Sequence, residues 1–389
     1  NTCHVYAIQE SNSINRAHLK YFGAGMDDIK KNAAKMQLEG LLDILTDAKE
    51  YGSILNVDAC DWDLLRRFVE QSGEDGQMSM DSFGLEDTKE QLRVLIDVGQ
   101  TMAQKYDTCV TNPPYMGSGG MGAKLSDYVK KNYPDSKSDL FATFIERCGK
   151  MAATNRYQAM ITQHAWMFLS SFEKLRKKLL QMDTVNMVHL GARAFEEIGG
   201  EVVQATSFVL RKSHTPTYKG TYCRLIEPTT QQGKEELFLA GENRFATAQD
   251  NFSKIPGSPI AYWASKFIIS AFENNTTIEE IAQTFRGLQP GNSLFVREWF
   301  EVIYSKIGWE SNSKSKWFPM SSGGESRKWY GNLDRIVNWE NDGYDIKQSG
   351  NAIIPNEMLY FRPVIGWSRI SSGRLCVRYY GENLIPGDA

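Results

Sequence analysis

The chain has 389 residues and a mass of 44.1 kDa, which favours two or more domains because one hydrophobic core rarely grows past about 250–300 residues. Its 44 basic and 47 acidic side chains nearly cancel, which excludes a histone-like polycation and leaves any nucleic-acid affinity to local patches. Hydrophobic residues make up 41% of the chain, as in globular proteins, and no stretch approaches the roughly 18 apolar residues of a membrane span.

No basic-then-apolar leader follows Asn1, so we expect a cytoplasmic protein without a membrane segment. The six cysteines are scattered without a CxxC pair or any other spacing typical of metal ligands. We therefore expect reduced thiols and no bound metal. No GxxxxGK[ST] loop is present, and nothing in the sequence indicates a nucleotide-driven motor.

The first hundred residues predict one strand followed by helices. Residues 4–8 are apolar and predict a short buried strand, which ends in the polar residues 9–12. Apolar residues recur at helical spacing over residues 27–49, where Asp27 stands in position to cap the helix. Two more helices are predicted over residues 61–70 and 86–104, so that residues 13–104 together form a helical insertion.

The apolar period changes at residues 106–111, which predict a strand that runs directly into Asn112-Pro113-Pro114-Tyr115. Beyond a glycine-rich loop over residues 116–122, helical and strand-like segments alternate, which predicts an α/β layer with a mainly parallel sheet. The expected helices cover residues 124–131, 140–153 and 171–182, and the expected strands cover residues 158–163, 185–190 and 206–210. We assign residues 1–212 to this first domain.

The composition changes after residue 212. Residues 213–288 mix polar turns with short apolar runs and predict a connecting region, with one helix over residues 260–273. Six of the nine tryptophans lie beyond residue 290, where β-like runs occur at residues 358–361 and 375–380. We expect residues 289–389 to begin a β-rich domain in which most of these tryptophans pack in the core.

The tetrapeptide Asn112-Pro113-Pro114-Tyr115 is the most specific chemical signal in the chain. The side-chain oxygen of an Asn and the carbonyl of the next residue can accept both hydrogens of an sp2 amino group. This shifts the nitrogen toward tetrahedral geometry and frees its lone pair for attack. The two prolines hold that carbonyl rigidly, and the ring of Tyr115 offers a flat face to a flipped base. The alternative is a strand that merely ends at a proline turn, which the adjoining glycine-rich loop disfavours.

A strand followed by NPPY resembles the catalytic motif of amino-group methyltransferases that use S-adenosylmethionine. The wider likeness is to the adenine-specific DNA methyltransferases of the BREX (PglX-type) phage-defence systems, and it spans nearly the whole chain. It rests on residues 111–117, 133–141, 161–173, 189–195, 329–332 and 337–341. The resemblance implies a Rossmann-like S-adenosylmethionine-dependent sheet with a C-terminal recognition domain, a double-stranded DNA substrate and other defence-system proteins as partners.

The resemblance also implies roles for individual residues. Asn112 and the Pro113 carbonyl would hold the amino group of a flipped adenine, and Tyr115 would stack on the base. Phe195 corresponds to a second aromatic residue against that base. Glu10 would contact the adenine of the cofactor, and Asn112 also belongs to the cofactor-binding set. Pro114 completes the catalytic motif.

One departure from the family concerns the cofactor loop. Phe22-Gly23-Ala24-Gly25 looks like a glycine-rich cofactor loop, but such a loop follows a buried strand, whereas residues 15–21 are polar and helical in character. We therefore expect a turn that ends a helix before the Asp27 cap. In the resembled family the true loop precedes a segment like residues 4–12, so we expect the catalytic domain to lack its N-terminal cofactor-loop portion.

Several weaker candidates complete the set. We expect a structural role for His164, because methyl transfer to adenine needs no histidine base, and a solvated helix face for the basic run at residues 174–178. The candidates for DNA contact are basic side chains near the glycine-rich loop and in the C-terminal part. These are Lys130, Lys131, Arg327 and Lys328, followed by Arg369, Arg374 and Arg378.

The sequence leaves three functions open. The first is site-specific methylation of adenine N6 in duplex DNA, acting in phage defence. The second keeps the chemistry but changes the substrate, since protein-glutamine and RNA methyltransferases also use the NPPY motif. They typically lack a large aromatic-rich domain downstream. The third is a non-catalytic DNA-binding component of a defence complex.

Overall fold

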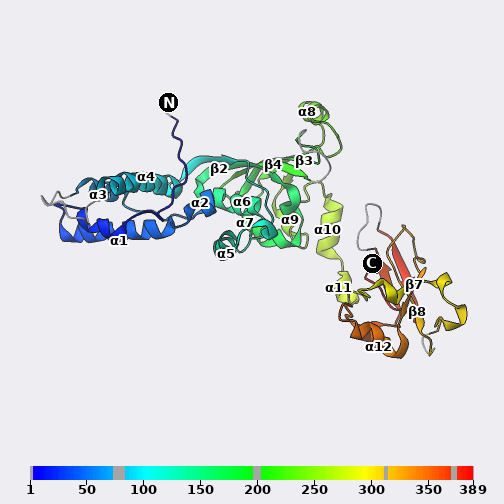
Figure 1. Cartoon of the computed structure of the whole chain (residues 1–389). Helices are drawn as coiled ribbons and strands as arrows, with labels where there is room; N and C mark the ends of the chain where they lie inside the picture. Colours follow the sequence, from blue (N-terminus) through cyan, green and yellow to red (C-terminus); the bar gives the residue numbers. More distant parts are fainter. Residues whose placement is uncertain (1–2, 73–83, 196–202, 311–313, 369–374, 389) are drawn as a thin grey trace. The chain divides into compact units, whose positions relative to one another are not determined.

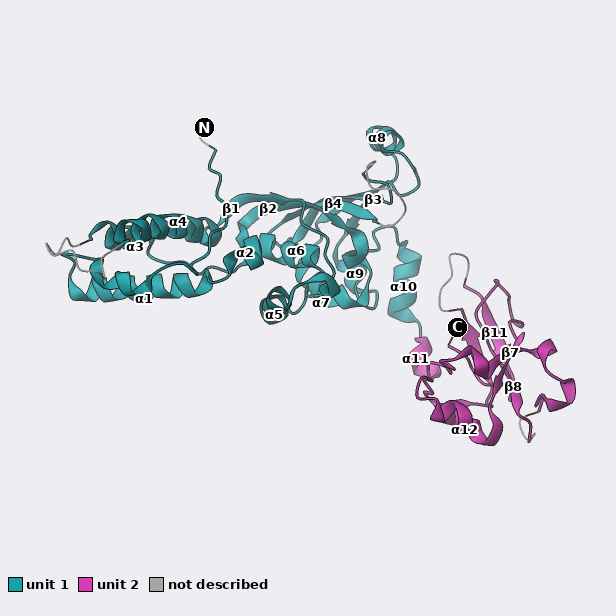
Figure 2. Cartoon of the chain, viewed as in Figure 1, with its two compact units in different colours: residues 1–275 teal, residues 276–389 magenta. Residues whose placement is uncertain are grey.

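The computed structural model describes residues 3–72, 84–195, 203–310, 314–368 and 375–388 (Figure 1). The chain divides into two compact units, Asn1–Asn275 and Thr276–Ala389, which Figure 2 shows in different colours. Each unit has its own hydrophobic core. None of the described helices combines the length and the apolar character needed to cross a bilayer.

The first unit begins with the expected helical insertion. Its helices are η1 (Arg16–Tyr21), α1 (Asp28–Ile44), α2 (Ala48–Tyr51), α3 (Trp62–Glu70) and α4 (Leu85–Ala103). The carboxylate of Asp27 accepts a hydrogen bond from the backbone N–H of Lys30, as the predicted cap requires. Leu38, Leu65 and Ile96, from α1, α3 and α4, are fully buried in one shared core.

The predicted strand at residues 4–8 is wrong. No strand forms there, and the side chain of Val5 is 88% exposed. A strand needs a neighbouring strand to satisfy its backbone groups, and residues 4–8 hydrogen-bond to none within the described part of the chain. Of this run, Ile8 packs against the helical core.

A six-stranded sheet follows the insertion, with the strand order β1-β2-β4-β3-β5-β6. The strands are β1 (Tyr106–Thr111), β2 (Ala152–Gln163), β3 (Asp183–Gly191), β4 (Ala205–Arg211), β5 (Lys219–Arg224) and β6 (Arg244–Ala248). The strands predicted in this region are confirmed, and β1 has the predicted bounds.

The expectation of a mainly parallel sheet needs correction, because the sheet is mixed. The pairs β1–β2 and β3–β5 are parallel, whereas β2–β4, β3–β4 and β5–β6 are antiparallel. The alternating order of elements did not reveal this, because it does not fix the direction in which β4 pairs with its neighbours β3 and β2. The last two strands also lie within the region expected to be a connector, so residues 219–248 complete the sheet.

Helices α6 (Leu140–Met151), α7 (Glu173–Leu179) and α9 (Asp250–Ser253) lie on one face of the sheet (Figure 1). They bury Phe141, Leu175 and Phe252 against Met160 and Phe208 of the strands. The burial of aromatic and aliphatic side chains of this size supplies most of the favourable free energy of a core. The remaining helices of the first unit are α5 (Ala123–Asn132), α8 (Gln231–Leu239) and α10 (Lys266–Asn274).

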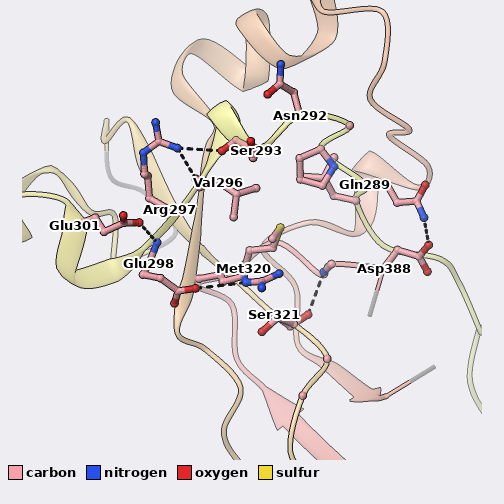
Figure 3. Close-up of a pocket in the computed structure, with 18 residues that line it drawn as sticks. Gln289, Asn292, Ser293, Val296, Arg297, Glu298, Glu301, Met320, Ser321 and Asp388 are labelled. Carbon is pink, nitrogen blue, oxygen red and sulfur yellow. Dashed lines mark hydrogen bonds and ion pairs between the residues drawn. The ribbon is translucent and has the colours of Figure 1, made fainter. Parts of the chain in front are cut away.

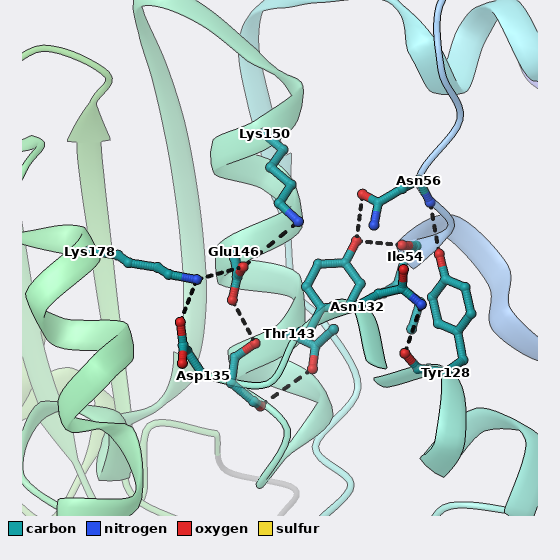
Figure 4. Close-up of polar contacts among 11 residues, drawn as sticks. Ile54, Asn56, Tyr128, Asn132, Asp135, Thr143, Glu146, Lys150 and Lys178 are labelled. Carbon is teal, nitrogen blue, oxygen red and sulfur yellow. Dashed lines mark hydrogen bonds and ion pairs between the residues drawn. The ribbon is translucent and has the colours of Figure 1, made fainter. Parts of the chain in front are cut away.

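Buried polar contacts join the helical insertion to the sheet. The Tyr133 hydroxyl donates to the Ile54 carbonyl at 2.6 Å and lies 3.0 Å from Asn56 Oδ1 (Figure 4). The buried guanidinium of Arg147, on α6, donates to the carbonyls of Ser53 and Met102 at 3.1 and 2.8 Å. These bonds satisfy carbonyls that would otherwise be buried without a partner.

The second unit contains two small sheets. One has three antiparallel strands in the order β7-β9-β8, and the other pairs β10 with β11. Their bounds are β7 (Val296–Glu298), β8 (Trp317–Met320), β9 (Arg335–Asn338), β10 (Val364–Trp367) and β11 (Val377–Tyr380), and α12 (Glu340–Gln348) follows β9. The prediction of a β-like run at residues 358–361 is wrong, because the chain forms a 3-10 turn there.

Only some of the six tryptophans beyond residue 290 lie in the core, although the sequence predicts a core position for most of them. Trp339 is buried and Trp309 and Trp317 are partly buried, whereas Trp299, Trp329 and Trp367 are exposed. Composition alone could not separate these positions, because a tryptophan in a short irregular segment has no periodicity to assign it to a face.

The contacts of Tyr133 give a first testable prediction. Tyr133→Phe removes the only donor to the buried Ile54 carbonyl among the described residues, so we expect the free energy of unfolding of the first unit to fall by about 1–2 kcal/mol. Urea unfolding followed by circular dichroism measures this change. The control Tyr6→Phe alters an exposed tyrosine and should stay within about 0.5 kcal/mol of wild type. Equal stability of the two variants would contradict the assigned role.

Candidate active site

The Asn112–Tyr115 motif leaves the sheet at the carboxyl end of β1. The backbone of β1 pairs with β2 up to Thr111, opposite Met160, and the chain then becomes irregular. Pro113 is buried, whereas Asn112 and Pro114 are exposed. The motif is therefore anchored through one proline ring and presents the Asn112 side chain outward.

The two groups predicted to grip an amino group have no partner in the described part of the chain. No described residue forms a hydrogen bond to the side chain of Asn112 or to the carbonyl of Pro113. An amide oxygen and a carbonyl oxygen on consecutive residues are thus available to a donor with two hydrogens. This arrangement suits a planar –NH2 group.

One carboxylate oxygen ties the chain that leaves the motif to the start of α6. Asp139 Oδ1 accepts a hydrogen bond from the backbone N–H of Met116 at 3.1 Å and from that of Phe141 at 3.2 Å. The Met116 carbonyl in turn accepts from the Leu140 N–H at 2.9 Å. Burial raises the pKa of Asp139, and the three backbone N–H groups of Phe141, Met116 and Leu140 oppose that rise.

The connection from α5 to α6 is held at a second point by charged side chains. Lys178 Nζ lies 2.7 Å from Asp135 Oδ2 and 3.0 Å from Glu146 Oε1 (Figure 4). The Ser136 hydroxyl donates to the other oxygen of Glu146 at 3.0 Å. Together with Asp139, these contacts fix both ends of residues 135–139 and thereby the segment against which the motif rests.

The ring of Tyr115 is half-buried. It meets Phe141 edge to face at a centroid distance of 6.0 Å, and Phe141 packs on Phe172 at 5.7 Å. The Tyr115 hydroxyl is buried without a hydrogen-bond partner among the described residues, and burial raises its pKa. The ring is thus held by aromatic packing from one side, and its orientation does not depend on a hydrogen bond.

Two further segments follow strands that end at the same edge of the sheet as the motif. His164 follows β2, and Phe195 lies four residues beyond the end of β3; β1, β2 and β3 all run in the same direction. Phe195 is half-buried. The sheet therefore brings Asn112 and Phe195 to one edge, which is where α/β folds gather ligand-binding residues.

His164 belongs to a chain of polar groups that the sequence did not reveal. His164 Nδ1 lies 2.7 Å from His189 Nε2, and His189 Nδ1 lies 3.1 Å from the Tyr262 hydroxyl. Burial lowers the pKa of both histidines, and it lowers that of His189 to about 4. The charges of Arg224 and Lys234 also lower the pKa of His189. Both rings are neutral at pH 7, which accords with the structural role expected for His164.

Glu10 lies beside α2. Its Oε1 is 3.9 Å from Lys49 Nζ, and its side chain stays partly exposed. The next residues line a polar hollow of about 560 Å3 together with Thr46. The glycine turn that follows η1 behaves as expected, because Gly23 and Gly25 adopt left-handed φ angles of 74° and 75° before the Asp27 cap.

The basic candidates are divided between the units. Lys130 and Lys131 are exposed in the last turn of α5, with Lys130 Nζ 3.6 Å from Asp127. Arg327 and Lys328 are exposed in the second unit. Of the run at residues 174–178, Lys177 pairs with Glu173 and Lys178 with Asp135 and Glu146, while Arg176 is buried, so the run is only in part a solvated face. Arg378 is buried, and Arg369 and Arg374 lie outside the described residues.

A hollow in the second unit lies between β7, β8 and the segment after Leu288, with a volume of about 860 Å3 (Figure 3). Its charged side chains contact other groups of the same unit. Arg335 lies 3.6 Å from Glu298, Gln289 donates to Asp388, and Arg297 donates to the carbonyls of Ser293 and Val296. None of the predicted site residues lines it. Among the described residues, no group of His, Cys, Asp or Glu side chains is arranged to hold a metal ion.

Asp139 and His189 are the residues that sequence reasoning missed. Asp139 stands directly before the apolar start of α6 and has the pattern of an N-cap, which identifies the cap but not its second bond to Met116. His189 occurs within a strand, where nothing in the sequence indicates a partner 25 residues away.

Comparison with known proteins confirms the resemblance expected from the sequence. Residues 20–195 match the family described as Eco57I restriction-modification methylase. The adenine-specific methyltransferase PglX of Lacticaseibacillus casei (strain Zhang) is 42% identical over 353 residues, covering 85% of this chain and 29% of that protein. BrxX of Escherichia coli O9:H4 (strain HS), also named an adenine-specific methyltransferase, is 38% identical over 351 residues, covering 88% of this chain and 28% of that protein.

The chain thus spans less than a third of the length of these curated relatives. Among solved structures, the type IIL restriction-modification enzyme MmeI in complex with DNA is similar with a TM-score of 0.43 and 12% sequence identity. That match covers 93% of this chain and 54% of MmeI.

The two hydrogen bonds that Asp139 accepts give a second prediction. Asp139→Ala removes the acceptor of both the Met116 and the Phe141 N–H groups, so we expect the free energy of unfolding to fall by about 1–2 kcal/mol. Asp139→Asn keeps an oxygen in the same place and should stay within about 0.5 kcal/mol of wild type. Asp127→Ala, which removes an exposed carboxylate, is the matched control for chemical denaturation. A loss in Asp139→Asn as large as in Asp139→Ala would contradict the capping role.

The buried histidine pair predicts a pH dependence of stability. The pKa of His189 is about 4 in the folded chain against an ordinary value near 6.5, so the unfolded chain takes up a proton first as the pH falls. Stability should therefore decline from pH 6.5 toward pH 4, by at most about 1.4 kcal/mol per pH unit for this group. His189→Gln should be less stable at pH 7 but show a shallower decline. An unchanged slope in denaturation curves across this range would contradict the assignment.

Proposed function

We propose that this relative of the PglX-type enzymes transfers a methyl group from S-adenosylmethionine to the N6 amino group of an adenine flipped out of duplex DNA. The observation that carries the proposal is a pair of acceptors, the Asn112 side-chain oxygen and the Pro113 carbonyl, which have no partner among the described residues and stand beside the half-buried ring of Tyr115. The names of the relatives support adenine as the target.

The two acceptors act on the lone pair of the target nitrogen. Each accepts one N–H of the amino group, so the nitrogen loses conjugation with the ring and its lone pair points away from both acceptors. Pro114 limits the backbone rotation that would move the Pro113 carbonyl, and Asp139 fixes the chain beyond Tyr115. The gain is preorganisation, since the acceptors already stand in place before the base arrives.

The aromatic side chains would hold the plane of the base. Phe141 packs edge to face against Tyr115, so the orientation of the Tyr115 ring does not depend on the substrate. Phe195 reaches the same edge of the sheet from β3 and would pack against the base as a second aromatic group. A flipped base loses its stacking in the duplex, and contacts with two rings replace part of it.

The donor set of the chain fits the proposed cofactor in part. Glu10 is a partly exposed carboxylate able to accept from an adenine amino group or a ribose hydroxyl, and Asn112 is exposed at the end of β1. S-adenosylmethionine supplies an electrophilic methyl group on a sulfonium. The task of Glu10 would be to bind and orient the cofactor, while Asn112 positions the attacking amino group.

The basic side chains would contact the phosphate backbone. Lys130 and Lys131 are exposed at the end of α5, and Arg327 and Lys328 in the second unit, which we assign as the start of a target-recognition domain. We also propose a role in phage defence together with other proteins of the defence system, which the resemblance to PglX and BrxX supports. Methylation of RNA or of a protein glutamine, and DNA binding without turnover, are the alternatives.

Replacement of Asn112 tests the proposal. In the full-length protein, Asn112→Ala should lower methyl transfer to duplex DNA about 100-fold or more, the scale for loss of one preorganised hydrogen-bonding group. Incorporation of labelled methyl groups into DNA, RNA and protein substrates measures the reaction and separates the alternative substrates. Asn186→Ala, an exposed position on β3, is the matched control and should retain wild-type activity.

Two results would contradict the proposal. If Asn112→Ala keeps activity within a few-fold of wild type, the motif does not grip the amino group. If label enters RNA or protein but not DNA, the substrate is wrong while the chemistry stands. Calorimetry with S-adenosylmethionine on wild type and Glu10→Gln tests the cofactor contact separately, with weaker binding expected for the variant.

A further inference from the structure

The loop between β8 and β9 of the second unit displays two aromatic side chains to solvent. Trp329 is 72% exposed and Tyr330 is 70% exposed. A large apolar ring contributes nothing to a core when it is exposed, so folding does not account for these two rings. An exposed aromatic pair of this kind commonly marks an interaction surface.

The backbone under these rings is firmly held. The Trp329 N–H donates to the Val377 carbonyl at 2.8 Å, and the Trp329 carbonyl accepts from the Tyr379 N–H at 2.9 Å, so the loop runs beside β11. The Tyr380 hydroxyl donates to the Gly331 carbonyl at 3.1 Å. Trp329 has a φ of 69°, in the left-handed region that bulky side chains rarely adopt, and such strained positions gather at functional sites.

The neighbouring hairpin extends the apolar area. In β10 and β11, Ile365 pairs with Tyr379 and Trp367 with Val377, so these side chains share one face, on which Ile365, Trp367 and Tyr379 are exposed. The alternate residues Arg378 and Tyr380 are buried and bond to each other at 2.8 Å. We call Trp329 and Tyr330 the aromatic surface, beside which Trp367 and Tyr379 of the hairpin are also exposed.

The charges around the aromatic surface favour a polyanion. Residues 325–330 and 362–368 carry three exposed basic side chains, Arg327, Lys328 and Arg362, and one acidic side chain, Glu325. Arg327 lies 3.5 Å from Glu325, while Lys328 and Arg362 are also exposed. Cations beside flat rings are the combination that binds nucleic acid, since the cations contact phosphates and the rings stack on bases.

We propose that the aromatic surface contacts the bases of duplex DNA, with Trp329 and Tyr330 packing against a base step while Lys328 and Arg327 contact the flanking phosphates. The inference rests on the proposed function and deepens it by naming the part of the second unit that touches bases. Aromatic and apolar side chains placed against a base step partly unstack it, and the fixed backbone of Trp329 keeps the ring ready for this contact.

Binding to a duplex by the full-length protein tests the inference. Trp329→Ala and Tyr330→Ala should each raise the Kd for duplex DNA about tenfold, measured by fluorescence anisotropy, with the salt dependence of the Kd unchanged. Trp329→Phe should stay within about threefold of wild type because it keeps a stacking ring. Lys328→Ala should instead lower the slope of log Kd against log salt by about one. Tyr344→Ala, an equally exposed tyrosine on α12, is the matched control.

The outcomes separate the inference from the proposed function. If wild type binds and methylates duplex DNA while Trp329→Ala and Tyr330→Ala bind as well as Tyr344→Ala, the inference is overturned and the proposed function stands. The aromatic surface would then serve a protein partner. If wild type neither binds nor methylates duplex DNA, the proposed function fails and the inference fails with it. Circular dichroism of each variant confirms that exposed substitutions leave the fold intact.

Discussion

The candidate site depends on one carboxylate oxygen that accepts hydrogen bonds from two segments of the chain. Asp139 Oδ1 caps the first turn of α6 and also binds the Met116 N–H, one residue beyond the motif. Because α6 packs on the sheet through Phe141 and its neighbours, the motif is fixed to the helix and the strand together. Without that bond, the chain after Pro114 would keep the packing of Tyr115 and the bond from the Leu140 N–H to the Met116 carbonyl, but it would be held less firmly, and the Pro113 carbonyl would lose part of the rigidity on which its proposed role depends.

Polar contacts also join other parts of the first unit. Tyr133 and Arg147 bind carbonyls of the helical insertion, so the insertion cannot shift without exposing buried acceptors. At the same edge of the sheet as the motif, neutral His164 and His189 bond to each other. Burial keeps both rings uncharged, so the pair places no positive charge beside the strand ends. Such a charge would repel a positive charge that develops on the substrate.

The sequence predicted the parts of the fold that are governed by local rules. Strand β1 and its abrupt end follow from an apolar run and two prolines, and the helices follow from their period and their caps. What failed depends on contacts distant in sequence. Residues 4–8 look like a strand but have no strand beside them among the described residues, and the direction of β4 is defined by its antiparallel pairing with β2 and β3. Of the site, the motif was located by its chemistry, whereas the second bond of Asp139 and the pairing of His189 need three dimensions. The roles given to Glu10, Phe195 and the basic residues stay predictions.

The geometry of the motif also places a demand on the rest of the protein. Two acceptors on adjacent residues can bind an adenine amino group only when that base has left the duplex, and extrusion costs a few kcal/mol of lost stacking and pairing. In the proposed function, Tyr115 would offset part of this cost by stacking on the base, but it would contact the base only after extrusion and could not begin it. Contacts made with the intact duplex must therefore supply the remainder. Phosphate contacts hold DNA without distorting it, whereas rings that press on a base step weaken its stacking. An exposed and rigidly held pair such as Trp329 and Tyr330 is suited to that task, which explains why an apolar surface is maintained in a unit whose net charge over residues 290–389 is only +1.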